Sequence, residues 1–164
     1  KNICKLIPDK IIKIGVFVNE NRNRLDSLNA DGFLDYFQLH GDEDPDYCEK
    51  VNGKLIKSFR IKNDFDLSLL RLFGKCEMYL FDTKVDNIFG GSGKTFNWEL
   101  LDALPRKHTI ILAGGLTEEN VGKAIDTVKP DMVDVSSSVE SSPGIKNHQK
   151  VSNFIKACRN HNSN

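Results

Sequence analysis

The sequence lacks a long apolar segment and a net charge. No apolar run approaches the roughly 20 residues of a membrane-spanning helix, and we expect no signal peptide. The 23 basic residues balance the 23 acidic residues, so the overall charge favours neither nucleic acid nor an anionic membrane as a partner. The sequence therefore gives no sign of a membrane-spanning segment or of a nucleic-acid or membrane partner.

The sequence also lacks a paired cysteine motif. Cys4, Cys48, Cys76 and Cys158 are far apart and have neither CxxC nor metal-ligand spacing, so we expect no metal site. Reduced thiols are usual in a cytoplasmic enzyme. Because 164 residues can bury a real core, we expect one cytoplasmic domain over residues 1–164.

The most informative stretch begins with the apolar run Met78-Tyr79-Leu80-Phe81, which is typical of a buried parallel strand. The run is followed by Asp82 and by a long loop with three glycines, among them Gly91. An acid at the C-terminal end of a strand, beside a loop with bare backbone, is how α/β enzymes present a proton donor to a small substrate. We therefore predict Asp82 as a general acid and Gly91 as a substrate contact.

The same loop contains Gly93-Lys94-Thr95, which matches the end of a nucleotide-binding P-loop. That motif also requires a glycine where the chain has Ile88, and a helix directly after the threonine. Residues 96–98 instead predict a loop that returns to the sheet. We therefore exclude a P-loop.

Strand-like and helix-like segments alternate along the chain. The expected strands are residues 11–18, 36–39, 55–61, 78–81, 109–113 and 132–135, and the expected helices are residues 20–31, a helix starting at Asp44-Pro45, 64–73, 98–104, 117–128 and 151–160. Asp44 is a typical cap, with proline at the first helical position. The 64–73 helix should carry Phe65, Leu69, Leu72 and Phe73 on one face. Such alternation implies a parallel sheet.

Two parallel architectures fit this alternation, a doubly wound open sheet and a (β/α)8 barrel. In barrels a phosphate commonly lies between the loops after strands seven and eight. Here the last two strands lead into Gly114-Gly115 and Ser136-Ser137-Ser138, both rich in small residues with free backbone N–H groups. This favours the barrel and makes these five residues candidate phosphate ligands. Thr117 is expected to cap the helix that follows the glycines.

Three further polar residues are candidates for the substrate site. His40 follows a strand, where it either lines the pocket or is a hydrogen-bonded structural histidine. Asp134 lies within the last expected strand and must reach the substrate or have a hydrogen-bond partner. Arg60 either meets an anion at the mouth of the barrel or is simply exposed.

Six motifs together resemble the phosphoribosylanthranilate isomerase family of tryptophan biosynthesis. They follow the family's order and rough spacing from about Ile11 to the end of the chain. The motifs are GVFVN (15–19), QLHGDE (38–43), DTK (82–84), GGSGKTFNW (90–98), LAGGLT (112–117), and VDVSS (133–137) with VE (139–140) and PG (143–144) after it.

The resemblance implies a (β/α)8 barrel that performs an Amadori rearrangement of N-(5-phosphoribosyl)anthranilate without a metal or organic cofactor. In the family, an acid after the sixth strand protonates the furanose ring oxygen, and a cysteine on the first strand removes the C2 proton. The matching acid is Asp82. To donate near neutral pH, such an acid needs a pKa raised by burial or by a neighbouring anion.

The chain departs from the family pattern in two ways. It represents strands three to eight, so two βα units, on the order of 50 to 60 residues, have no match. We expect these units to exist outside the printed sequence; a true fragment is expected to be inactive, because the base is missing. We expect Cys4 to lie in the helix that precedes the first strand of this chain, or in the segment that leaves that helix. The second departure is Ser138, where the family has glycine and where a side chain is expected to crowd the phosphate or force an unusual backbone angle.

Other functions were weighed against the isomerase. Indole-glycerol-phosphate synthase or a sugar-phosphate epimerase should show a lysine base or a His/Asp metal set at the strand ends, and we find neither. A non-catalytic phosphate-binding fragment is the alternative from another class. The expected partner is a small phosphorylated substrate, with no nucleic acid or membrane, and the expected state is a monomer or homodimer.

Overall fold

The computed structural model describes residues 3–61, 65–82, 98–101 and 107–161. The chain divides into two compact units. The first unit comprises Lys1–Phe59 and Ser68–Leu80, and the second comprises Arg60–Leu67 and Phe81–Asn164. In the described residues, no helix is long and apolar enough to cross a bilayer.

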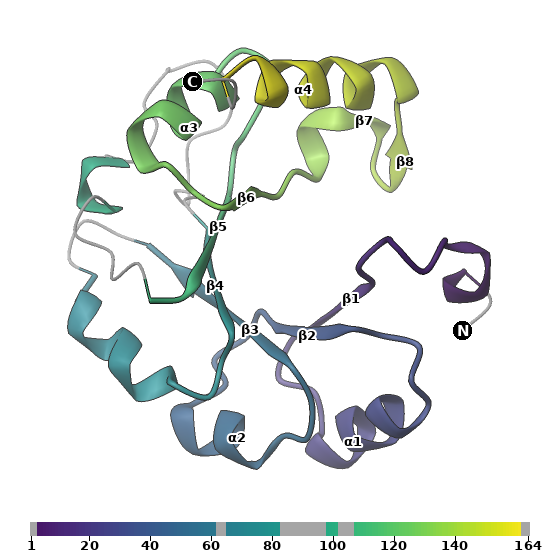
Figure 1. Cartoon of the computed structure of the whole chain (residues 1–164), viewed down its shortest axis with the longest axis vertical. Helices are drawn as coiled ribbons and strands as arrows, with labels where there is room; N and C mark the ends of the chain where they lie inside the picture. The colour runs from purple at the N-terminus through teal and green to yellow at the C-terminus, as the bar shows by residue number, and fades with distance from the viewer. Residues whose placement is uncertain (1–2, 62–64, 83–97, 102–106, 162–164) are drawn as a thin grey trace. The chain divides into compact units, whose positions relative to one another are not determined.

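Six strands form one sheet whose order follows the chain from β1 to β6 (Figure 1). They are β1 (Ile14–Phe17), β2 (Tyr36–Leu39), β3 (Leu55–Arg60), β4 (Met78–Asp82), β5 (Thr109–Ala113) and β6 (Met132–Val133). The predicted strands at 36–39 and 109–113 are confirmed residue for residue. The other four are confirmed with ends shifted by one to three residues.

The strand order also decides between the two architectures expected from the sequence. The strands are parallel, with Ile14 opposite Tyr36 and Ile111 opposite Met132. A doubly wound sheet reverses its strand order at a switch point, whereas the strands of a barrel follow one another in chain order. Because the order β1 to β6 has no reversal, it favours the barrel.

Helices follow most strands, but several are shorter than expected. The α-helices are α1 (Arg22–Ala30), α2 (Pro45–Lys50), α3 (Val121–Val128) and α4 (His148–His161), and the 3-10 helices are η1 (Cys4–Leu6), η2 (Leu67–Phe73), η3 (Trp98–Leu101) and η4 (Ser137–Val139). The predicted start of α2 is confirmed, because the Asp44 side chain accepts a hydrogen bond from the Tyr47 amide at 2.7 Å. A short antiparallel hairpin, β7 (Glu140–Ser142) and β8 (Ile145–Lys146), was not expected.

The η2 segment corrects the α-helix predicted over residues 64–73. A 3-10 helix has three residues per turn, so Leu70 and Phe73 share a face. Leu70 is buried, and the Phe73 ring packs edge-on against Phe59 with centroids 5.2 Å apart. Leu69 and Leu72, expected on the apolar face, are 44% and 51% exposed.

The predicted cap at Thr117 is also wrong, because α3 begins only at Val121. The Asn120 side chain holds the preceding residues in a turn by accepting from the Thr117 amide at 2.8 Å and donating to the Gly115 carbonyl at 3.0 Å. Thr117 Oγ1 accepts from the Glu119 amide at 3.3 Å within this turn. The end of α3 at Val128 is as predicted.

Helices α3 and α4 approach closely at Gly122, a buried position on α3. A Cβ atom added to Gly122 would collide with the His161 imidazole. Nδ1 of that imidazole also lies 3.1 Å from a carboxylate oxygen of Asp126, one turn further along α3. The absent side chain at Gly122 therefore makes room for the His161 imidazole.

The buried hydroxyl of Tyr79 provides a test of the packing around η2. The hydroxyl donates to the Leu70 carbonyl at 2.9 Å and to the Phe73 carbonyl at 3.3 Å. Tyr79→Phe should therefore lower the unfolding free energy by about 1 kcal/mol in urea denaturation. The matched control is Tyr36→Phe, because the Tyr36 hydroxyl bonds Glu77 at an exposed site, and its effect should stay within about 0.5 kcal/mol. Equal losses in the two variants would contradict this assignment.

Candidate functional site

Most of the predicted site residues belong to the second unit and lie at or after the C-terminal ends of β4, β5 and β6. Asp82 is the last residue of β4 and is half-buried, and its carbonyl accepts from the Ile61 amide at 3.1 Å. Gly114 directly follows β5, and Asp134 directly follows β6. Because the strands are parallel, these C-terminal ends lie at one edge of the sheet. Gly91 lies outside the described residues.

The glycine pair makes a turn that other residues adopt poorly. Gly114 has φ +84° and Gly115 has φ +63°, both in the left-handed region. No atom lies within 4 Å of the position of a Cβ on Gly115, and this residue is exposed. The two bonds from Asn120 hold the turn, so its backbone is both accessible and fixed.

The serine segment, Ser136 to Ser138, is held from two sides. Ser138 Oγ donates to the Leu116 carbonyl at 2.6 Å. Lys146 Nζ donates to the Ser136 carbonyl at 2.9 Å and to Ser136 Oγ at 3.3 Å. The same ammonium group forms an ion pair with Glu140 at 2.8 Å. The segment is therefore fastened both to the glycine turn and to the β7–β8 hairpin.

Ser138 does not have the unusual backbone angle expected from the comparison with glycine. Among the described residues, the non-glycine residues with positive φ are Asn19 and Lys129. Ser138 instead lies in η4, where φ is negative and a serine is unstrained. That part of the expectation is wrong.

Asp134 and Arg60 are both exposed in this chain. Asp134 lies one residue beyond β6, not within it as predicted, because β6 pairs only through Met132 and Val133. Its amide donates to the Leu112 carbonyl at 2.8 Å. Arg60 is the last residue of β3. The substrate roles of both residues stay predictions.

His40 follows β2 in the first unit and is half-buried. Its Nδ1 lies 3.0 Å from Gln38 Nε2, and an amide nitrogen can only donate. In this orientation of the amide, Nδ1 accepts, so a neutral ring carries its proton on Nε2. The predicted role of His40 in the pocket stays a prediction.

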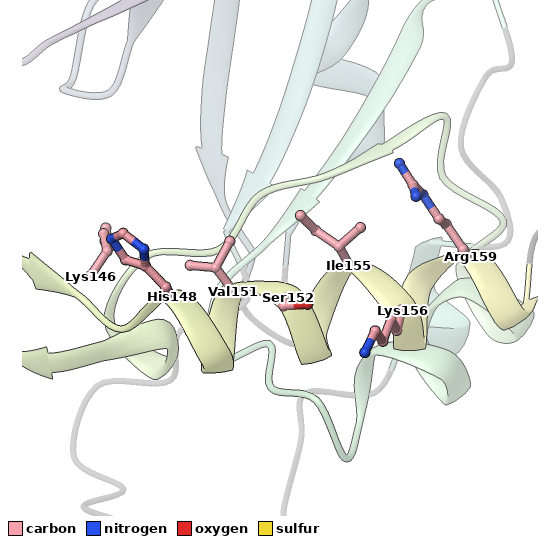
Figure 2. Close-up of a pocket in the computed structure, with 7 residues that line it drawn as sticks. All are labelled: Lys146, His148, Val151, Ser152, Ile155, Lys156 and Arg159. Atoms are coloured by element: carbon pink, nitrogen blue, oxygen red, sulfur yellow. The ribbon is translucent and has the colours of Figure 1, made fainter.

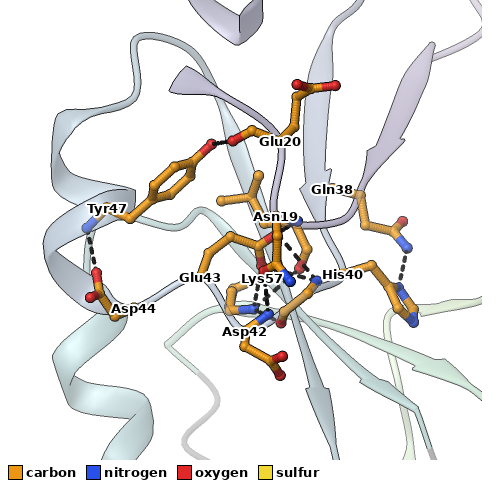
Figure 3. Close-up of polar contacts among 11 residues, drawn as sticks. Asn19, Glu20, Gln38, His40, Asp42, Glu43, Asp44, Tyr47 and Lys57 are labelled. Carbon is orange, nitrogen blue, oxygen red and sulfur yellow. Dashed lines mark hydrogen bonds and ion pairs between the residues drawn. The ribbon is translucent and has the colours of Figure 1, made fainter. Parts of the chain in front are cut away.

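A buried ion pair beside His40 was missed in the sequence (Figure 3). Lys57 on β3 is 4% exposed and Glu43 is 6% exposed. Lys57 Nζ lies 2.9 Å from Glu43 Oε2 and 2.8 Å from the Gly41 carbonyl. A lysine in the middle of an apolar strand requires a buried acceptor. That position was the signal in the sequence that could have revealed the pair.

Glu43 also joins the segments that follow β1 and β2. Its Oε1 accepts from the Asn19 amide at 2.8 Å, and its Oε2 accepts from the Gly41 amide at 3.0 Å. Asn19, at φ +50°, in turn accepts from the Asp42 amide at 2.8 Å through Oδ1. These bonds link both strand ends to one carboxylate.

The environment of Glu43 lowers the pKa of its carboxyl group. Burial by itself raises this pKa, but the hydrogen bonds from Lys57 and from backbone amides, together with the positive charge of Lys57, outweigh burial. A lowered pKa means that the stabilisation is present above the carboxyl's ordinary pKa and is lost as the pH falls through the lowered value. The pair therefore stabilises the fold at neutral pH.

The four cysteines are free thiols. Cys48 and Cys76 are buried, and the hydrogen bond from the Cys76 thiol to Cys48, together with burial, raises the pKa of the Cys76 thiol. Cys4 lies in η1, which confirms that it belongs to a helical segment before β1. Among the described residues, no group of three or more His, Cys, Asp or Glu side chains is arranged to hold a metal ion.

A groove of about 600 Å³ runs along α4 (Figure 2). Its lining combines apolar side chains with basic ones, namely Lys146, His148, Val151, Ser152, Ile155, Lys156 and Arg159. No residue predicted from the sequence as a ligand contact lines it. Lys146 lines the groove and also bonds Ser136, so the groove borders the serine segment.

Breaking the buried ion pair should strongly destabilise the chain. Glu43→Gln leaves a buried ammonium group without its carboxylate, so the unfolding free energy should fall by about 3–5 kcal/mol in urea denaturation. Lys57→Met with Glu43→Gln should cost less than the two single changes added together. The control is Lys50→Met, which removes an exposed pair with Asp46 and should cost less than about 1 kcal/mol. Additive losses in the double variant would show that the two side chains are not coupled.

The chain is similar to known proteins over most of its length. The family model "N-(5'phosphoribosyl)anthranilate (PRA) isomerase" matches residues 3–157. The N-(5'-phosphoribosyl)anthranilate isomerase of Syntrophomonas wolfei is 46% identical over 153 residues, which cover 93% of this chain and 74% of that relative. The isomerase of Trichlorobacter lovleyi is 43% identical over 157 residues, which cover 94% of this chain and 75% of that relative.

Solved structures give the same result. The phosphoribosylanthranilate isomerase of Thermotoga maritima superposes with a TM-score of 0.82 at 36% identity, covering 97% of this chain and 78% of that one. A second isomerase structure, in complex with reduced 1-(o-carboxyphenylamino)-1-deoxyribulose 5-phosphate, superposes with a TM-score of 0.78 at 32% identity and covers 97% of this chain and 77% of that one. The fold is therefore that of the (β/α)8 barrel, with six of its parallel strands in this chain. The chain belongs to the N-(5'-phosphoribosyl)anthranilate isomerase family of tryptophan biosynthesis.

Proposed function

We propose that this chain isomerises N-(5-phosphoribosyl)anthranilate to 1-(2-carboxyphenylamino)-1-deoxyribulose 5-phosphate, with Asp82 as the general acid and without a metal or organic cofactor. The observation that carries the proposal is the position of three groups at one edge of the sheet. Asp82 ends β4, the glycine turn follows β5 and the serine segment follows β6. An acid and an anion site are thus available to a single phosphorylated sugar.

Asp82 starts the reaction by donating its proton to the furanose ring oxygen. The C1–O bond breaks as the nitrogen lone pair forms the C1=N bond, which gives a protonated Schiff base. A base then removes the proton from C2, and the resulting enaminol tautomerises to the ketone. The resemblance to the family assigns that base to a cysteine on the first barrel strand, and we assign it to none of the described residues.

The glycine turn and the serine segment are the proposed phosphate site. Gly115 is exposed and has open space above its Cα, so its backbone can approach an anion without steric cost. Ser136 and Ser137 are exposed as well. Backbone N–H groups and hydroxyls are suitable donors for phosphate oxygens. Asp134, Arg60, His40 and Gly91 are proposed as further substrate contacts.

The partner is proposed to be this small phosphorylated substrate, since a related isomerase was solved with a reduced product analogue. We also propose a single catalytic domain, a cytoplasmic location and a monomeric or homodimeric state. A Thermotoga maritima isomerase is described as dimeric, which supports considering both states. Size-exclusion chromatography with light scattering separates them.

Removing the acid should abolish turnover without unfolding the protein. Asp82→Asn keeps the shape of the side chain but cannot donate the proton, so kcat of the full-length protein should fall by roughly 10²–10⁴-fold. The readouts are turnover of N-(5-phosphoribosyl)anthranilate and growth of a tryptophan-requiring strain. Asp46→Asn is the control, because Asp46 pairs with Lys50 on exposed α2. Near-normal turnover by Asp82→Asn would exclude Asp82 as the acid.

Inorganic phosphate should bind at the two strand-end segments. Titration into ¹⁵N-labelled protein is expected to shift the amide signals of Gly115 and Ser137, since these N–H groups would donate to the anion. Phosphate should also compete with the substrate in the turnover assay. Amides of the β7–β8 hairpin, such as that of Ile145, serve as an internal reference. Shifts confined to regions away from both segments would place the anion elsewhere and reject this site.

A further inference from the structure

We propose that the Ser138 hydroxyl is a positioning group that fixes the glycine turn and the serine segment to each other, so that both bind one phosphate together. The inference rests on the proposed phosphate site and adds the residue that organises it. No contact between Ser138 and the substrate is required. Its effect is on the geometry of its neighbours.

The bond that carries the inference joins residues 22 positions apart. Ser138 Oγ donates to the Leu116 carbonyl at 2.6 Å, at a half-buried site. Leu116 directly follows Gly115 and is 2% exposed, so its carbonyl is attached to a well-packed residue. A short bond to such a residue fixes the distance between the two segments.

Each segment is also anchored to its own surroundings. Asn120 Nδ2 donates to the Gly115 carbonyl at 3.0 Å, and Lys146 Nζ donates to the Ser136 carbonyl at 2.9 Å. These bonds restrain the segments separately, whereas the Ser138 bond joins one to the other. The three bonds together define where the amides of Gly115 and Ser137 lie.

A fixed arrangement matters because two consecutive glycines have large conformational freedom. If the turn and the serine segment moved independently, binding of phosphate would have to restrict both, and affinity would fall. A bond already present in the free protein removes much of that cost. The Ser138 hydroxyl is therefore expected to raise phosphate affinity.

The opposite effect on phosphate affinity is expected if Ser138 is compared with the glycine that the resembling family has at this position. If the Ser138 side chain crowded the anion, shortening it would tighten binding. The observed bond directs the hydroxyl to Leu116 instead. The two ideas thus predict changes of opposite sign for the same variants.

The test compares Ser138→Ala and Ser138→Gly with Ser141→Ala. Ser141 Oγ also donates to a backbone carbonyl, that of Ile145 at 3.2 Å, but this bond lies within the β7–β8 hairpin. The Kd for inorganic phosphate, from amide titrations, should rise about 3- to 10-fold in both Ser138 variants and less than about 2-fold in Ser141→Ala. Unchanged or tighter phosphate binding by Ser138→Ala overturns the inference. Failure of the chain without substitutions to bind phosphate also overturns it.

Two further readouts separate positioning from simple stability and from the proposed reaction. A purely structural role would lower the Tm of Ser138→Ala and leave the phosphate Kd unchanged, which counts against the inference. In the full-length protein, Ser138→Ala should raise KM while kcat changes little. If the full-length protein lacks isomerase activity but the Ser138 variants still lose phosphate affinity, the proposed reaction fails and the inference stands. If turnover is present and phosphate affinity is unaffected, only the inference fails.

Discussion

Lys57 places an ammonium group in the middle of β3, where only 4% of the residue is exposed. An unpaired charge at such a depth is not tolerated, so a carboxylate must be supplied from a neighbouring segment. Glu43 supplies it and, through its other contacts, binds the amides of Asn19 and Gly41. The need to pair the buried Lys57 ammonium group therefore shapes the segments that follow β1 and β2. His40 lies beside these segments (Figure 3).

In the second unit the segments that follow the strands are organised by backbone geometry and hydrogen bonds. Two left-handed glycines give an accessible turn after β5, and Asn120 holds it. Ser138 and Lys146 hold the segment after β6. A phosphorylated sugar has a proton-accepting ring at one end and a dianion at the other. In the proposed reaction, Asp82 would serve the ring oxygen and these two segments the phosphate.

Local sequence patterns were enough for much of this fold. The β-branched and apolar runs of β2 and β5 fixed both strand ends correctly, and Asp44 with Pro45 marked the start of α2. Failures arose where tertiary contacts decide the outcome. In the 3-10 helix η2, Leu70 packs inward while Leu69 and Leu72 are exposed, and Asn120 bonds the turn before α3, so that the helix starts after Thr117. The strand-end residues of the proposed site were predicted from their positions. The Lys57–Glu43 pair and the Ser138 bond were not, because each joins residues distant in sequence.

The glycine on α3 beneath His161 has a consequence for the carboxyl-terminal helix. The position without a side chain leaves the space that the imidazole occupies beside Asp126. An alanine at Gly122 would push the imidazole away and separate it from Asp126. The end of α4 would then lose this contact, even though both residues that form it were left intact.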